Sequence, residues 1–206
     1  MADYLKRVCR FFALMALVPL FAGFIGPWSE TLGAMVLIFC IPVALIVQLV
    51  GTAIWLSRGA KLPMEGRRRE RMIVLGMAPL LLLASLLALL PLFVAGNFLG
   101  GFTRLTVNRD HYEAIIAQAR KDPENAMLKE DRGVEYSTEA GPPVRVLFNP
   151  DGARGFAGAI IYDPTGDMIA AKGWDDDPKQ VTMLFTGGLL ACRHLIGQYY
   201  TCWFDW

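Results

Sequence analysis

The sequence is poor in the residues that build catalytic and metal sites. Its 206 residues include two histidines, His111 and His194, with no cluster of cysteine or aspartate beside either. A zinc site needs three or four ligands at suitable spacing, so we expect no metal. The sequence also lacks a phosphate-binding loop, a dinucleotide-binding glycine motif and a G-x-S-x-G nucleophile motif. These absences disfavour an enzyme and predict no cofactor.

Charge is missing from three long stretches of the first half. Residues 11–29, 31–57 and 72–103 contain 19, 27 and 32 positions without Asp, Glu, Lys or Arg. A membrane helix needs about 20 mostly apolar residues. We therefore predict three transmembrane helices at about 11–28, 33–56 and 72–99, which make residues 1–102 a membrane anchor. Since ion pathways need ionisable groups at membrane depth, the spans argue against a transporter or channel formed by this chain alone.

Basic residues predict the orientation of these spans. Lys and Arg occupy positions 6, 7 and 10 and six positions between 57 and 71, whereas 27–32 contains none. Because basic loops stay in the cytoplasm, we expect a cytoplasmic N-terminus and residues 103–206 outside it. In a bacterial inner membrane that location is the periplasm. The spacings Ala22-x-x-x-Gly26 and Gly96-x-x-x-Gly100 suit helix packing, within the chain or in a homo-oligomer.

The two halves of the chain differ in charge. Residues 1–102 hold 9 basic and 4 acidic residues, and residues 103–206 hold 11 basic and 15 acidic residues. An acidic water-exposed half excludes a nucleic-acid-binding protein built on a basic domain.

The second half predicts a small α+β domain. Apolar residues recur at helical spacing over 108–121, and Asp110 with Glu113 matches a capping box, so we expect a separate amphipathic helix there. Alternating and β-branched segments separated by turns then predict an antiparallel meander. Its expected strands are 133–137, 144–148, 156–162, 168–172, 181–185, 190–195 and 199–204.

The last hairpin predicts a disulfide. If its turn is centred on Gly197, directly opposed residues have numbers that sum to 394, and Cys192 faces Cys202. Opposed Cβ atoms in the closer type of antiparallel pair lie near disulfide distance. The alternative is a thiol nucleophile, because Cys192 and His194 share one face of a strand. The two interpretations exclude each other, and we prefer the disulfide.

Acidic turns and late aromatic residues are the candidate partner-binding features. The residues are Asp163, Asp167, Asp175, Asp176, Asp177, Tyr199, Trp203 and Trp206. The aspartates lie in turns at one predicted end of the sheet, where they would suit a basic protein partner. Three consecutive carboxylates do not match a calcium loop. The competing interpretations are a solvated acidic loop and, for the aromatic residues, a two-sided core or contact with the membrane surface.

These patterns predict an inner-membrane-anchored periplasmic domain that binds a protein. The first hypothesis is an immunity protein that neutralises a toxin acting in the envelope. The alternatives are an accessory subunit of an envelope assembly or secretion complex and an envelope thiol enzyme that uses Cys192 and His194.

Overall fold

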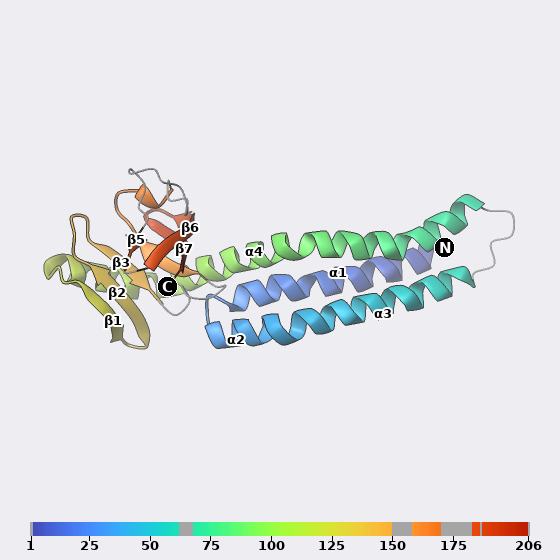
Figure 1. Ribbon diagram of the computed structural model, residues 1–206, viewed down its shortest axis with the longest axis horizontal. Coiled ribbons are helices and arrows are strands. Elements are labelled where there is room, and N and C mark those ends of the chain that lie inside the picture. Colours follow the sequence, from blue (N-terminus) through green and yellow to red (C-terminus); the bar gives the residue numbers. More distant parts are fainter. Residues whose placement is uncertain (1, 62–67, 150–157, 170–182, 186, 206) are drawn as a thin grey trace. The chain divides into compact units, whose positions relative to one another are not determined.

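The computed structural model describes residues 2–61, 68–149, 158–169, 183–185 and 187–205 (Figure 1). The chain forms two compact units. The first unit comprises Met1–Gly23 and Met35–Gly96, and the second comprises Phe24–Ala34 and Asn97–Trp206. The helices are α1 (Ala2–Ile25), α2 (Glu30–Met35), the π-helix η1 (Val36–Cys40), α3 (Ile41–Ala60) and α4 (Arg68–Lys121).

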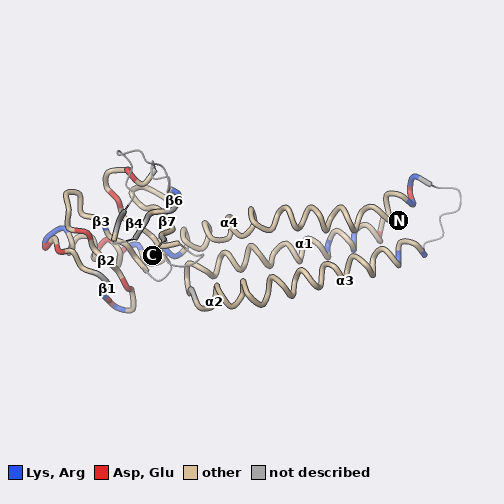
Figure 2. Tube along the Cα trace, in the orientation of Figure 1, with Lys and Arg blue, Asp and Glu red and all other residues tan. Residues whose placement is uncertain are grey.

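The first unit is a helical bundle with an apolar surface. Within the described residues, three helical segments are long and apolar enough to cross a membrane: Ala2–Ile25, Thr31–Ala60 and Arg69–Lys121. Large side chains such as Phe39, Leu87 and Leu90 are two-thirds exposed, as lipid-facing residues are and as residues facing water rarely are. Figure 2 shows the middles of these helices free of charge, with Lys and Arg gathered at the end of the bundle that holds the N-terminus. The predicted set of three membrane-spanning helices is therefore supported.

Polar groups inside this bundle satisfy one another. The Ser85 hydroxyl donates to Gln48 Oε1 at 2.6 Å, and Thr52 Oγ1 donates to the Gln48 carbonyl at 2.7 Å. The Tyr4 hydroxyl donates to the Trp55 carbonyl at 2.7 Å. A buried amide without a partner would be costly in an apolar environment, so these bonds explain how Gln48 is accommodated.

Residues 108–121 are helical as predicted, but their separation from the third apolar helix is wrong, because α4 runs without a break from Arg68 to Lys121. No proline lies between Asn97 and Lys121, and Glu113 pairs with Arg109 one turn earlier rather than capping a new helix. The helix ends just before Pro123, which cannot continue it.

The second unit is built on an antiparallel sheet. In the described residues its strands are β1 (Ala126–Asp131), β2 (Val134–Glu139), β3 (Arg145–Phe148), β4 (Ala159–Tyr162), β5 (Met183–Leu184), β6 (Gly187–Ile196) and β7 (Tyr199–Asp205). Their spatial order is β1-β2-β3-β4-β7-β6-β5. The prediction of a simple meander is thus wrong at one point, since β4 pairs with β7 rather than with the next strand of the chain.

One further strand prediction fails, and one strand was missed. The strand expected at 168–172 begins instead as the 3-10 helix η2 (Asp167–Ile169), because the Asp163 carboxylate accepts the Met168 N–H and holds the chain in a turn; residues 170–172 lie outside the described residues. Strand β1 was not predicted. Its sequence is strongly charged, and Leu128 interrupts its alternation with φ +53°.

Both faces of the sheet are buried. On one face, α4 contributes Leu105, Tyr112, Ile115, Ile116 and Ala119 to a core shared with the sheet residues Val134, Val146, Phe148, Ile160, Tyr162, Leu195 and Tyr199. Tyr112 stacks on Phe148 with ring centroids 4.0 Å apart. The other face forms a second core of Leu147, Ala159, Ile161, Met168, Phe185, Leu189, Tyr200, Cys202 and Phe204. Tyr199 and Tyr200 therefore enter different cores, as a two-sided core requires.

Candidate functional site

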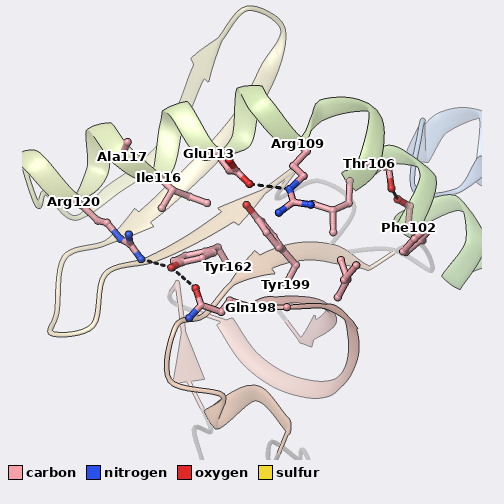
Figure 3. A pocket seen from close by; sticks show the side chains of 13 residues that line it. Phe102, Thr106, Arg109, Glu113, Ile116, Ala117, Arg120, Tyr162, Gln198 and Tyr199 are labelled. Carbon is pink, nitrogen blue, oxygen red and sulfur yellow. Dashed lines mark hydrogen bonds and ion pairs between the residues drawn. The ribbon is translucent and has the colours of Figure 1, made fainter.

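A groove of about 700 Å³ lies within the second unit (Figure 3). One wall is the face of α4 that carries Phe102, Leu105, Thr106, Arg109, Glu113, Ile116, Ala117 and Arg120. The other wall is formed by Tyr162 of β4, the turn Ile196, Gly197 and Gln198, and Tyr199 of β7. This volume is in the usual range for small-molecule sites.

Two polar arrangements line the groove. Arg120 donates to the Tyr162 hydroxyl, which donates to Gln198 Oε1 at 2.7 Å. Arg109 Nε donates to Glu113 Oε1 at 2.8 Å, and both side chains are more than half exposed. An exposed ion pair one helical turn apart adds only about 0.3–0.5 kcal/mol to stability. Little free energy is therefore lost when the Arg109 side chain turns to another partner.

Tyr199 supplies a hydroxyl to the same groove. The Tyr199 residue is 7% exposed, and its ring packs edge-on against the Tyr162 ring, with the ring centroids 5.5 Å apart. Figure 3 shows the hydroxyl pointing towards the Arg109–Glu113 ion pair, and within the described part of the chain it makes no hydrogen bond. Burial, followed by the charge of Glu113, raises the pKa of Tyr199 to about 12. The hydroxyl is therefore protonated at neutral pH and is available as a donor.

Two residues of the predicted acidic surface, Asp163 and Asp167, are described, and both bind Arg145. Asp163 is fully buried, and its Oδ1 accepts hydrogen bonds from Arg145 Nε at 3.0 Å and the Thr165 hydroxyl at 2.8 Å. Burial opposes ionisation, but the hydrogen bonds from Thr165 and Arg145 outweigh it and hold the Asp163 pKa below its usual value. Asp163 is thus an internal ion-pair residue and not part of an exposed partner surface. Asp167 is half exposed and also binds Arg145, at 3.0 Å.

The other predicted partner residues fall in different places. Tyr199 lines the groove, and Trp203 lies partly buried on β7. The residues Asp175, Asp176, Asp177 and Trp206 lie outside the described residues. Among the described residues, Tyr199 therefore faces the groove, whereas Asp163 and Asp167 bind Arg145.

The predicted disulfide is confirmed. Cys192 pairs with Cys202 across β6 and β7, with their Cα atoms 4.1 Å apart, and the two sulfurs are bonded. The expected register fails only nearer the turn, where a bulge pairs Ile196, rather than Leu195, with Tyr199. Because its sulfur is bonded, Cys192 is not a thiol nucleophile in this structure. His194 Nε2 lies 2.9 Å from the Gly197 carbonyl instead.

Sequence analysis missed the groove. The signal was present as a stripe at positions 102, 105, 106, 109, 113, 116, 117 and 120, which share one face of a helix. What the sequence does not indicate is the opposite wall, since the turn at Gln198 meets Tyr162 only through the β4–β7 pairing.

The described residues combine three helical segments long and apolar enough to span a membrane with a small disulfide-bonded β domain. No protein-family model, curated protein or solved structure matches the chain. Within the described part of the chain, no group of three His, Cys, Asp or Glu side chains is placed to hold a metal ion.

Proposed function

We propose that this chain is a bacterial inner-membrane protein whose second unit folds in the periplasm and binds a protein partner there. The specific role proposed is immunity: the domain occludes a toxin that acts in the cell envelope. The observation that carries this proposal is the continuity of α4.

Helix α4 enters the domain core without a linker. The uncharged stretch 72–103 ends two residues before Leu105, which is 1% exposed and packs in the core with Tyr112 and Ile116. The stretch of chain between the last uncharged residue and the first core residue is therefore too short to act as a long tether. Such a domain suits a partner that must be met at the membrane surface.

Two features support the periplasmic location. Basic residues gather at the end of the first unit that holds the N-terminus, as expected for a cytoplasmic end (Figure 2). The Cys192–Cys202 disulfide suits an oxidising compartment.

Orientation is tested with alkaline phosphatase fusions in the whole chain. A fusion after Trp206 should be active, and a fusion at Gly66 should be inactive, because the enzyme folds only where disulfides form. Activity at Gly66 would reverse the orientation and remove the periplasmic proposal.

Immunity is tested by survival. Proteins encoded by the genes next to the gene for this chain are each exported to the periplasm of cells that produce the chain and of cells that do not. We expect the chain to restore growth of the cells that export one of these proteins. Asp175→Lys, Asp176→Lys and Asp177→Lys together should weaken protection if the acidic run meets a basic toxin. The matched control carries Asp110→Lys, Asp122→Lys and Glu130→Lys, which change the charge equally at exposed sites.

Equal loss in both triple variants would assign the effect to net charge rather than to the acidic run. A chain that protects against none of these proteins contradicts immunity. If it nevertheless forms a stoichiometric complex with an envelope assembly or secretion machine, the accessory-subunit hypothesis replaces it.

A further inference from the structure

The first unit carries exposed arginines at the seam between α1 and α3. Arg7 on α1 and Arg58 on α3 are both exposed, and each stands one helical turn or less outside an uncharged stretch, 11–29 or 31–57. Figure 2 shows Lys and Arg gathered at this end of the helices. Both arginines belong to the same compact unit, so contacts between the two helices fix where they lie.

Contacts of α1 place Arg7 at the outer edge of this seam. The Tyr4 ring of α1 packs edge-on against the Trp55 ring of α3, with the ring centroids 5.5 Å apart. Two turns further along α1, a Cβ on Gly51 of α3 would lie 2.5 Å from Cζ of Phe11. Arg7 stands three residues after Tyr4 and four before Phe11, so the three side chains share one face of α1.

Arg58 reaches the same seam from α3. Its guanidinium carbon lies 5.4 Å from the centroid of the Trp55 ring, the ring that Tyr4 contacts. Trp55 therefore lies between the two helices that carry the arginines. In the part of the chain that the structure describes, neither the Arg7 nor the Arg58 guanidinium makes a hydrogen bond or an ion pair. Guanidinium forks with free donors match the oxygens of a phosphate.

The charge around the seam favours an anion. The described basic residues of the first unit are Lys6, Arg7, Arg10, Arg58, Lys61, Arg68, Arg69 and Arg71, and its described acidic residues are Asp3 and Glu70. Asp3 precedes Arg7 by one turn, but among the described residues no ion pair joins the two. The positive charge at the seam is therefore available to a ligand.

Exposed apolar side chains continue from the arginines towards the middle of the helices. Ile54, one turn before Arg58 on α3, is 44% exposed, and Leu14, two turns after Arg7 on α1, is 61% exposed. These spacings keep each apolar residue on the helix face of its arginine. Both apolar residues lie inside the uncharged stretches that can cross a bilayer. A free phosphate would leave them uncovered, whereas a phospholipid offers a phosphate followed by an acyl chain.

The geometry points to a binding site for one anionic phospholipid at this seam. Its phosphate is held by the Arg7 and Arg58 guanidinium groups beside Trp55, and one acyl chain lies along Ile54 and Leu14. The site goes beyond the protein partner proposed above. It lies within the first unit and does not depend on which side of the membrane either end occupies.

The test uses the full chain in nanodiscs with photo-crosslinking from one of two positions. Benzoylphenylalanine replaces Ile54 at the seam or, as a control, Ile73 on α4, which is 41% exposed. The Tyr4 hydroxyl lies 2.7 Å from the Trp55 carbonyl and 3.5 Å from the Val74 carbonyl, so positions 54 and 73 stand at the same level of the bundle. Bulk lipid should therefore reach both positions equally.

The nanodiscs contain phosphatidylglycerol with a tagged acyl chain or, in a parallel sample, tagged phosphatidylcholine. We expect labelling at position 54 with phosphatidylglycerol to be about tenfold higher than labelling at 73. We expect the same excess over labelling at 54 with phosphatidylcholine, because only the first lipid carries a net negative charge.

Three charge variants separate a defined site from the general charge of this end. Arg7→Gln and Arg58→Gln should each lower labelling at position 54 about fivefold, because each removes one of the two cations that hold the phosphate. Arg69→Gln removes the same charge at the same end and should not change the labelling. Arg69 is exposed and precedes the buried Val74 by five residues, so it lies on the outer side of α4. Arg7 and Arg58 are exposed as well, so all three variants should melt close to the parent.

Four results would overturn the proposal. Labelling that persists in both seam variants would show contact with bulk lipid alone. An equal loss in Arg69→Gln would assign the effect to the total charge of this end. Equal labelling by the two lipids would remove the role of the anionic headgroup. A crosslink from position 54 to a polypeptide in place of lipid would assign the seam to a protein ligand.

Discussion

Replacing Arg145 with methionine would leave a buried carboxylate without its cation. Asp163 is fully buried and Arg145 is 13% exposed at its side chain, with Nε 3.0 Å from Oδ1. The position follows from register: Val146 pairs with Tyr162 across β3 and β4, which brings the two charged residues beside each other at the end of the strands. Methionine keeps an unbranched apolar stem and removes the charge and the donors.

The expected loss is about 3 kcal/mol of unfolding free energy at neutral pH. Removing one partner of a buried ion pair costs about 3–5 kcal/mol. The lower end applies because the Asp163 carboxylate keeps hydrogen bonds from the Thr165 hydroxyl, the Thr165 N–H and the Met168 N–H. Asp167→Asn breaks only the half-exposed pair with Arg145, so it should cost less than about 1 kcal/mol.

The loss should shrink in acid. The lowered pKa of Asp163 means that its ionised form stabilises the parent above the unfolded pKa of about 3.9, and that this contribution is lost as pH falls through the folded pKa. In the variant, burial without Arg145 raises the pKa of Asp163. Glu139, whose pKa burial already raises, loses the attraction of Arg145 as well. The difference should therefore begin to shrink as pH falls through the raised pKa of Asp163 in the variant, and the parent and the variant should converge once pH is below the lowered folded pKa of Asp163 in the parent.

Urea unfolding of the full chain in detergent, followed by near-ultraviolet circular dichroism, measures these differences. Arg132→Met, at an exposed turn position, is the matched control and should be close to neutral. A loss below about 1 kcal/mol for Arg145→Met, or a loss that does not decrease in acid, would refute the assignment of this pair as a buried stabilising contact.

Three further predictions use the same assay. Cys192→Ala with Cys202→Ala should cost about 3 kcal/mol, the chain-entropy value for a separation of 10 residues, and an unchanged midpoint would contradict it. The unfolding free energy of the parent should fall by about 2–3 kcal/mol between pH 10 and 12, because unfolded tyrosine ionises near pH 10 whereas Tyr199 keeps its proton to about pH 12. Tyr199→Phe should reduce this fall. The same fall in the parent and in Tyr199→Phe would contradict the raised pKa of Tyr199. A fragment 108–206 should be about 2–5 kcal/mol less stable than 97–206, because it lacks the core residue Leu105, and equal stability would exclude that role.

The sequence by itself determined the features that depend on neighbouring residues. Three long stretches without charge predict three helices able to span a membrane, because a helix satisfies its backbone within one segment. The Cys192–Cys202 pair follows equally from a local property, since Gly197 has φ +59° in the turn and fixes the register a few residues away. The bulge at Ile196 escaped prediction because it alters only the pairs closest to that turn.

Tertiary structure decided the features that depend on distant segments. Asp163 follows a strand and precedes Pro164 and Thr165, so its local sequence indicates an exposed turn; only the pairing of β3 with β4 supplies Arg145 and buries the carboxylate. The capping-box pattern at Asp110 does not start a helix, because Leu105 and Tyr112 pack in the same core from one continuous helix. The groove exists because β7 pairs with β4 and sets Tyr199 opposite α4, and pairing between strands so far apart in the chain leaves no local pattern in the sequence.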